Sequence, residues 1–365
     1  IAYNAQAALF LKLKMRKQGQ QRYASALKIY RRLTTQDAKN PQNHLLLAGM
    51  HHNLGYVAQL DEDWSQAEKS YEQAERIQRR VADLFPMVAS YQLNEVRFTI
   101  GKLKAQLQQK KFDLVFEQTP QLEQRWKKHQ SETLPFPQVQ DMIASGYHDL
   151  GLFLNRNGKP DQAMGFYLKS RALDRQLTKQ FPDLMAARSR LAQTIHNLGL
   201  LHLEAGEVKP ALRNVEEAIR LRKALIKDQP SNRKHRSDLA WSYQGRARIL
   251  AQIPGGRGGT IQARQHEVAV LEELYGSDKA DADLIHRLAN AHFEMGIAMQ
   301  QARQPHIGHW MKAIGIWDKL KSHETKNPEH LVNWSQCLHN LGMYHGGRKA
   351  YAEAETCYEK ATELR

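Results

Sequence analysis

Glycines recur along this chain of 365 residues at intervals of 46 to 51 residues. The seven members of the series are Gly55, Gly101, Gly151, Gly199, Gly245, Gly296 and Gly342. Three of them end the tetrapeptide His-Asn-Leu-Gly, and Gly151 ends its close variant His-Asp-Leu-Gly. A repeat of this length predicts a solenoid, in which each unit packs on its neighbours, in place of one globular core.

The sequence predicts that each unit consists of two helices joined by a short turn. In the unit around Gly55, apolar residues recur with a helical period over 46–57 and again over 67–81. Small residues follow the glycine by 12 and 19 positions, as Ala67 and Ala74 do here. We expect these small side chains to let the first and second helices pack closely.

A glycine in the first helix, two small residues in the second and a proline after it resemble the tetratricopeptide repeat. The standard unit has about 34 residues, and this one averages about 48, so the second helix is longer. Long units of this kind are similar to the repeats of kinesin light chains. The resemblance implies an all-α, tetratricopeptide-like α-solenoid, a right-handed superhelix of antiparallel helix pairs.

We expect a partial N-terminal repeat over residues 1–40 and a solenoid of seven repeats over 41–365. The seven expected repeats are 41–86, 87–137, 138–182, 183–230, 231–276, 277–328 and 329–365. The second is irregular, because Asp113 and Pro120 stand where small residues are expected, and the proline should shorten or kink its helix. Since Ile1 opens the chain inside a helical pattern, we expect the chain to be part of a longer polypeptide.

The charge balance favours a partner with acidic groups. The chain has 53 Lys and Arg against 38 Asp and Glu, a net charge of +15, with basic stretches before Asp37 and over 220–236. Nucleic acid could bind non-specifically to these basic faces, but no stacking aromatic recurs once per repeat, which argues against it. No apolar run is long enough to span a membrane, so a membrane tether would lie outside this chain. Two cysteines without a disulfide pattern favour a cytoplasmic location.

No motif in the sequence indicates chemistry. The glycine-rich segment 255–259 lacks the Lys-Ser/Thr of a phosphate-binding loop. The histidines recur once per repeat, and copies one repeat apart are too distant to share a metal ion. We therefore expect no catalytic residues, no metal site and no cofactor, and a non-enzymatic protein.

The residues two and three positions before the glycines are candidates for a binding groove, because the first helices line the concave surface of a tetratricopeptide superhelix. The candidate residues are His52, Asn53, Phe98, His148, Asp149, His196, Asn197, Tyr243, Phe293, His339 and Asn340. A row of amides and imidazoles can bond to an extended peptide backbone, and the kinesin-light-chain resemblance implies the same use of its asparagines. The alternative is that these side chains cap or bridge neighbouring helices.

The leading functional hypothesis is a scaffold that binds a segment of a partner protein in its concave groove. The repeat pattern, clearest over residues 189–199, also resembles the C-terminal arrays of large planctomycetal serine/threonine kinases. That resemblance implies a kinase domain, and often a membrane helix, upstream of such an array. The second hypothesis is therefore the sensor or docking arm of a larger serine/threonine kinase, and the third is non-specific nucleic-acid binding.

Overall fold

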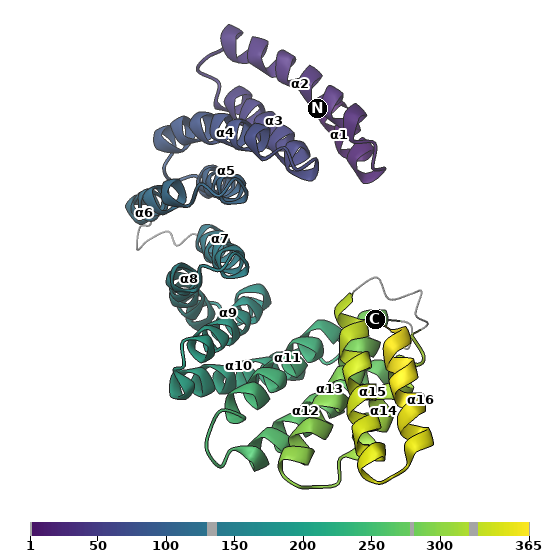
Figure 1. Cartoon of the computed structure of the whole chain (residues 1–365). Helices are drawn as coiled ribbons and strands as arrows, with labels where there is room; N and C mark the ends of the chain where they lie inside the picture. Colours follow the sequence, from purple (N-terminus) through teal and green to yellow (C-terminus); the bar gives the residue numbers. More distant parts are fainter. Residues whose placement is uncertain (1, 130–136, 278–280, 321–327, 365) are drawn as a thin grey trace. The chain divides into compact units, whose positions relative to one another are not determined.

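The computed structural model describes residues 2–129, 137–277, 281–320 and 328–364. In these segments the chain forms sixteen helices and no strand, which confirms the expected all-α solenoid of helix pairs (Figure 1). Two compact units divide the chain, residues 1–182 and residues 183–365. Ile1 and Arg365, at the ends of the expected domains, lie outside the described residues. No helix in the described part is long and apolar enough to cross a bilayer.

Four helix pairs make up the first unit, and in each of them an odd-numbered helix packs on the even-numbered helix that follows. The helices are α1 (Ala2–Lys12), α2 (Arg16–Gln36), α3 (Pro41–Leu60), α4 (Trp64–Leu84), α5 (Ala89–Gln108), α6 (Phe112–His129), α7 (Pro137–Arg156) and α8 (Pro160–Gln180).

The second unit is built in the same way. Its helices are α9 (Met185–Glu204), α10 (Val208–Asp228), α11 (Arg233–Leu250), α12 (Arg257–Ser277), α13 (Ala282–Gln301), α14 (Ile307–Trp317), α15 (Pro328–Gly347) and α16 (Tyr351–Glu363). In both units some odd-numbered helices also contact the next odd-numbered helix, as α5 contacts α7 and α9 contacts α11.

One residue between the two helices of each pair has a left-handed backbone, with φ between 56° and 79°. These residues are Lys14, Glu62, Lys110, Gly158, Gly206, Gly255, Arg303 and Lys349. The first five are spaced evenly (62 − 14 = 48, and 48 again for each later step). A left-handed residue lets the chain leave the first helix and reverse direction, so these turn residues mark the true period of the repeat.

Against this period, two of the seven glycines do not belong to the series. Gly55, Gly151, Gly199, Gly296 and Gly342 are each the fifteenth residue of their helix, whereas Gly101 and Gly245 are each the thirteenth. The fifteenth residues of α5 and α11 are Leu103 and Ala247, both fully buried. The unequal intervals on either side of Gly101 and of Gly245 arise from this shift of two residues.

Four of the five glycines at the fifteenth position make room for a ring on the second helix of the same pair, and Gly199 faces Val215 instead. A β-carbon on Gly55 would lie 3.0 Å from the ring of Tyr71, and one on Gly151 would lie 2.8 Å from the ring of Tyr167. The two misaligned glycines have other neighbours, since Gly101 faces the same Tyr71 from the next pair and Gly245 faces the ring of His196. The small residues that the sequence analysis placed at these crossings are confirmed, because Ala67 and Ala74 are fully buried, as are their counterparts in α8 and α10.

The pair α5–α6 departs from the expectation. Counted 12 and 19 positions from Leu103, the residues at which α6 crosses α5 are Val115 and Leu122. The assignment of Asp113 and Pro120 to these positions was therefore wrong by the same two residues. Pro120 is exposed, and α6 continues through it to His129, with 18 residues against 21 in α4. Three larger side chains thus occupy the crossing where α3–α4, α7–α8 and α9–α10 have small ones.

Candidate functional site

The histidines three residues before the glycines pack against aromatic rings of the second helix. Their ring centroids lie 5.5 Å (His52 and Tyr71), 5.7 Å (His148 and Tyr167) and 5.5 Å (His339 and Tyr358) apart. The spacing along the sequence from histidine to tyrosine is the same in all three pairs. His148 is buried, His52 is half-buried and His339 is exposed. The recurrence of histidine at this position therefore reflects packing within each helix pair.

His196 occupies the same position in α9 but faces no aromatic ring on α10, where Val215 stands in place of the tyrosine. Burial lowers its pKa to about 3, with a further contribution from the nearby charges of Arg222 and Arg248. The ring is therefore neutral near pH 7. Its Nδ1 is buried and has no hydrogen-bond partner among the described residues.

The three aromatic candidates belong to the core. Phe98, Tyr243 and Phe293 are each 5% exposed or less. Phe98 and Tyr243 were placed from Gly101 and Gly245, so both lie two residues away from the intended position. Phe293 takes the place of the histidine in α13, with its ring centroid 6.3 Å from that of Trp317. None of the three presents a side-chain surface to a partner.

The polar residues at the thirteenth position of the odd-numbered helices, two residues before the glycine, are half-buried and lie where the helix meets solvent. They are Asn53, Asp149, Asn197, Asn340 and also Glu294, which the sequence analysis left out of the candidate set. In the first unit two of them bridge neighbouring odd-numbered helices. Asn53 Nδ2 donates to Asn4 Oδ1 of α1 at 3.1 Å, and Lys104 Nζ of α5 donates to Asp149 Oδ2 at 2.5 Å. The bridging role, left open by the sequence, is thus present at these two positions.

These residues belong to a wider surface, which we name the odd-helix stripe: the ninth, thirteenth and sixteenth residues of the odd-numbered helices from α3 to α15. Spacings of four and three place the three side chains on one face. In the first unit they are Gly49, Asn53 and Tyr56 of α3, Arg97, Gly101 and Lys104 of α5, and Ser145, Asp149 and Leu152 of α7. In the second they are Gln193, Asn197 and Leu200 of α9, Trp241, Gly245 and Arg248 of α11, Asn290, Glu294 and Ile297 of α13, and Gln336, Asn340 and Met343 of α15.

The stripe contains unusually exposed apolar side chains. Tyr56 is 45%, Trp241 43% and Met343 59% exposed. The guanidinium of Arg287, on α13, lies over the Trp241 ring, 4.4 Å from its centroid, and donates to Ser237 Oγ of α11 at 2.7 Å. Aromatic and Met side chains are enriched in protein interfaces, and Trp and Tyr are common among the few residues that carry most of the binding energy. The stripe thus combines such side chains with polar groups.

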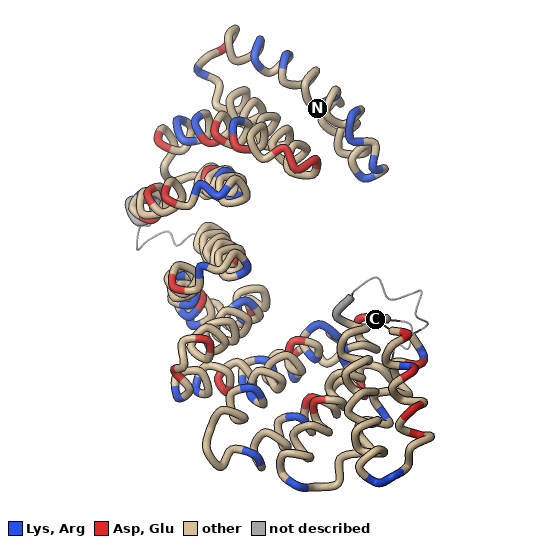
Figure 2. The backbone as a smooth tube through the Cα atoms, viewed as in Figure 1, with Lys and Arg blue, Asp and Glu red and all other residues tan. Residues whose placement is uncertain are grey.

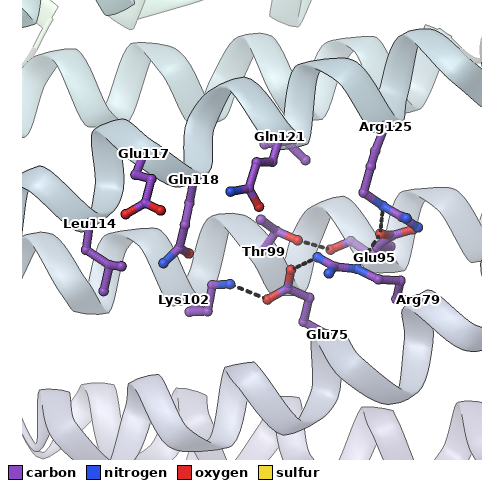
Figure 3. A pocket seen from close by; sticks show the side chains of 11 residues that line it. Glu75, Arg79, Glu95, Thr99, Lys102, Leu114, Glu117, Gln118, Gln121 and Arg125 are labelled. Carbon is purple, nitrogen blue, oxygen red and sulfur yellow. Dashed lines mark hydrogen bonds and ion pairs between the residues drawn. The ribbon is translucent and has the colours of Figure 1, made fainter.

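A cavity of about 260 Å³ lies between α4, α5 and α6 in the first unit (Figure 3). Two nearly buried carboxylates line it, Glu75 from α4 and Glu95 from α5. Lys102 Nζ lies 2.5 Å from Glu75 Oε2, and Arg125 Nε lies 2.7 Å from Glu95 Oε1. Arg79 pairs with both carboxylates. The cavity is where α6 stands away from α5, and paired charges occupy its walls.

The cavity offers no arrangement typical of catalysis or metal binding. Each of its two buried carboxylates is paired with two cations. Within the described segments, no group of three or more His, Cys, Asp or Glu side chains has the arrangement of a metal site. The free thiols of Cys337 and Cys357 have pKa values raised by burial, so neither is an activated nucleophile.

Two segments, residues 191–231 and 334–365, match the family model of the tetratricopeptide repeat. The first covers most of α9 and all of α10, and the second most of α15 and all of α16, so each match falls on one helix pair. The chain is a tetratricopeptide-repeat protein. No curated protein sequence matches it.

Several solved structures are similar to this tetratricopeptide-repeat protein. Aspartyl phosphate phosphatase F from Bacillus subtilis has 13% identity, with 92% of this chain and 73% of that chain covered and a TM-score of 0.44. A putative kinesin light chain with nearly identical TPR-like repeats, from Podospora anserina, has 18% identity, 62% and 95% coverage and a TM-score of 0.40. BtubC from P. vanneervenii has 15% identity, 94% and 88% coverage and a TM-score of 0.30.

A tetratricopeptide fold fits a protein-interaction scaffold, and the surface that such a scaffold would use was only partly visible in the sequence. Asn53, Asp149, Asn197 and Asn340 were found, because they precede an easily recognised glycine. Trp241 was missed. Trp241 stands one full repeat after Gln193, so the period measured from the turns, rather than from the glycines, would have placed it on the stripe.

Proposed function

We propose that this tetratricopeptide-repeat protein is a non-enzymatic scaffold that binds an extended segment of a partner protein along the odd-helix stripe of each unit. The observation that carries the proposal is the stripe itself, in which a polar thirteenth residue is followed by an apolar sixteenth residue on α3, α7, α9, α13 and α15. Behind it lies a packed layer of histidines and aromatic rings. A partner can therefore bind without any rearrangement of the core.

The polar residues of the stripe retain hydrogen-bonding capacity after they bridge two helices. An asparagine amide has two donor hydrogens and an oxygen with two lone pairs. Asn53 uses one hydrogen toward Asn4, and its oxygen lies 3.4 Å from His52 Nδ1. A peptide group of a partner could take the second hydrogen, so bridging and recognition are compatible at this position.

The charge of the protein favours an acidic partner. Three basic residues of the stripe, Arg97, Lys104 and Arg248, stand against two acidic ones, Asp149 and Glu294, and the protein as a whole carries +15. Acidic segments are therefore attracted to this surface and repelled from few parts of it. We propose the same stripe as the docking surface in either setting, a free cytoplasmic scaffold or the arm of a larger serine/threonine kinase.

The test uses peptides selected from a random display library on the immobilised protein. We expect acidic extended peptides whose binding weakens by about 0.5–1.5 kcal/mol for each of Asn53→Ala, Asn197→Ala and Asn340→Ala. Trp241→Ala should cost about 2 kcal/mol, as expected of an exposed anchor. Gln162→Ala, an exposed amide on the even-numbered helix α8, is the matched control and should have no effect.

Melting curves of the same variants separate recognition from bridging. Recognition predicts weaker peptide binding with a nearly unchanged melting temperature. If the asparagine variants instead melt earlier and the selected peptides bind as before, the polar positions serve the fold alone and the proposal is wrong.

A further inference from the structure

Two histidines from the helices of one pair meet in the second unit. Nδ1 of His292, on α13, lies 3.1 Å from Nδ1 of His309, on α14, and their ring centroids are 5.4 Å apart. His292 is 2% exposed, whereas His309 is half-buried. These two residues are not copies one repeat apart, as the histidines beside the glycines are. They are therefore close enough to share a metal ion.

A carboxylate favours one proton position on the buried ring. Oε1 of Glu272, on α12, lies 3.5 Å from Nε2 of His292. A neutral imidazole has one protonated nitrogen and one with a free lone pair. Because an ionised carboxylate only accepts, it favours the form of His292 with the proton on Nε2 and the lone pair of Nδ1 directed at His309. Metal-binding histidines commonly have this arrangement, with the ion at one ring nitrogen and a carboxylate at the other.

Both rings are neutral near pH 7. Burial lowers the pKa of His292 to about 4, with contributions from His309 and Lys312. Burial also lowers the pKa of His309, as Lys312 does, while Glu272 raises it. Imidazole binds a metal ion in its neutral form, so neither ring has to lose a proton first.

The separation of the two Nδ1 atoms suits one ion between them. Nitrogens that lie about 2.0–2.1 Å from a zinc ion are about 2.9 to 3.4 Å apart when the angle at the ion is about 90° to 109°. The observed 3.1 Å falls in this range. A second histidine pair does not offer such a site, because His286 and His330 stack face to face and Nδ1 of His286 already accepts from Nε1 of Trp317.

A proton on Nδ1 of His309 makes the same contact a hydrogen bond. Among the described residues, none is shown to bond to Nε2 of His309. The ring can therefore carry its proton on Nε2 instead. Two lone pairs then face each other at Nδ1, and a cation between them relieves their repulsion. The hydrogen bond and the ion are thus alternatives at one place.

The surroundings of the pair admit a cation, although the chain as a whole is basic. Helices α12, α13 and α14 contain five acidic residues (three, two and none) and four basic ones (two, one and one). Figure 2 shows charges of both signs on α12 and α13. A divalent ion at the pair therefore meets no excess of positive charge on these helices.

We propose that His292 and His309 bind one divalent ion of the zinc type through their Nδ1 atoms, with Glu272 orienting His292. Two protein ligands leave two positions of a tetrahedral ion to water, on the side of the half-buried His309. Imidazole suits zinc, copper and nickel, whereas magnesium and calcium prefer oxygen ligands. The ion joins α14 to α13. This inference is independent of the odd-helix stripe, to which neither histidine belongs.

Calorimetric titration of the metal-free full chain with Zn²⁺ tests the proposal. Because the chain has 17 histidines, the site is defined by the equivalent of Zn²⁺ that His309→Gln removes. Glu272→Gln should weaken binding of the same equivalent about tenfold, through loss of the orienting carboxylate. His266→Gln, at an exposed histidine of α12 that lies beside Tyr243, is the matched control and should bind as the parent does. Mg²⁺ should not bind at this site.

Hydrogen exchange followed by mass spectrometry locates the ion. Zn²⁺ should slow exchange in peptides from α13 and α14 and leave those from α3 and α4 unchanged. Melting temperatures should rise with the concentration of Zn²⁺ in the parent and not in His309→Gln. With a chelator present, Glu272→Gln should melt like the parent, because its side chain is 52% exposed. A change in its affinity for Zn²⁺ then does not reflect a loss of fold.

The proposal fails if the metal-free parent takes up no Zn²⁺ that His309→Gln fails to take up. It also fails if the protection from exchange appears away from α13 and α14. The contact between His292 and His309 is then a hydrogen bond between two neutral rings, and its role is to hold the pair α13–α14 together.

Discussion

The pairs α3–α4 and α5–α6 are neighbours in the chain and reverse direction through the same kind of turn, yet their helices cross differently. At the three crossing positions α3–α4 has Gly55, Ala67 and Ala74. The pair α5–α6 has Leu103, Val115 and Leu122 at the same places. The small set lets a tyrosine ring fill the crossing, whereas the large set leaves α6 apart from α5, with a cavity of about 260 Å³ beside it.

The difference teaches how one repeat tolerates larger residues at a crossing. Overpacking of a close crossing costs free energy, and a small increase in the distance between the helices relieves it. The space that opens must then be filled or hydrated. Here the acids Glu75 and Glu95 and their cationic partners from three helices occupy it, so the pair is held partly by ion pairs at its edge (Figure 3).

The largest expected effect comes from placing a small side chain at the point where α5 crosses α6. Leu103→Ala should destabilise α5–α6 by about 3 kcal/mol, because the fully buried side chain leaves a void that Val115 and Leu122 keep open. Hydrogen exchange followed by mass spectrometry would report the loss in peptides from α5 and α6. Gln108→Ala, at an exposed position of the same helix, is the control. Slower exchange in the Leu103 variant would mean that the pair closes up, and that side-chain size does not hold it open.

The reverse substitution introduces leucine, the residue of α5 at this crossing, into α3. Gly55→Leu should cost about 2 kcal/mol, because the Tyr71 ring lies between Gly55 and Gly101 and cannot move aside. Gly55→Ala should cost much less, since its β-carbon needs only a shift of a few tenths of an ångström and alanine favours the helix. Urea unfolding of the two variants beside the parent protein gives the comparison. Equal stability of all three would show that the glycine is not required at this crossing.

Most of the fold could be predicted from the sequence, since amphipathic period, turns and small residues agree over most of the chain. The pair α5–α6 was misassigned because Gly101 lies two residues from the place of the missing glycine. The presence of a glycine in the sequence does not show which side chain it faces in the structure. Leu103 is an ordinary helix residue, and only the spacing from Glu62 to Lys110 to Gly158 reveals its position.

The candidate site was predicted less well than the fold. A recurring histidine indicates a shared environment, but the sequence does not show whether that environment is a groove or a ring packed on Tyr71 or Tyr167. The polar neighbours Asn53 and Asp149 were found for the same reason that the histidines were, their place beside the glycine. Exposure decides between the two roles, and exposure follows from packing between helices far apart in sequence.

A fall in pH should lower the stability of the pair α3–α4 more than that of the pair α5–α6. His51 in α3 is buried, and burial, aided by the charges of Arg31 and Arg76, lowers its pKa from 6.5 to about 4. Thr99 takes this place in α5. Between pH 6.5 and 4 the unfolded chain binds a proton at His51 that the folded chain does not, so stability falls as the pH falls through this window. Above this pH window His51 is neutral in both the folded and the unfolded chain, so it adds no pH dependence to the stability.

The expected loss between neutral pH and about pH 5 is roughly 1–2 kcal/mol, read from urea unfolding or from exchange in α3 and α4. His51→Gln should remove that part of the pH dependence, while exchange in α5, corrected for the intrinsic rate, stays unchanged. If α5 loosens as much as α3 does, the acid sensitivity belongs to the whole unit and not to this histidine.

The smallest expected effect concerns the feature that the two pairs share. Glu62 and Lys110 hold the left-handed turn at φ of 58° and 60°, a conformation that glycine adopts without strain. Glu62→Gly and Lys110→Gly should each stabilise the protein by about 1 kcal/mol, and Gly158→Ala in α7–α8 should cost a similar amount. Thermal melts of the three variants provide the measurement.

Because the turn lies outside the crossing, the two gains should be equal although the crossings differ. Unequal gains would show that the separation of α5 and α6 also strains their turn.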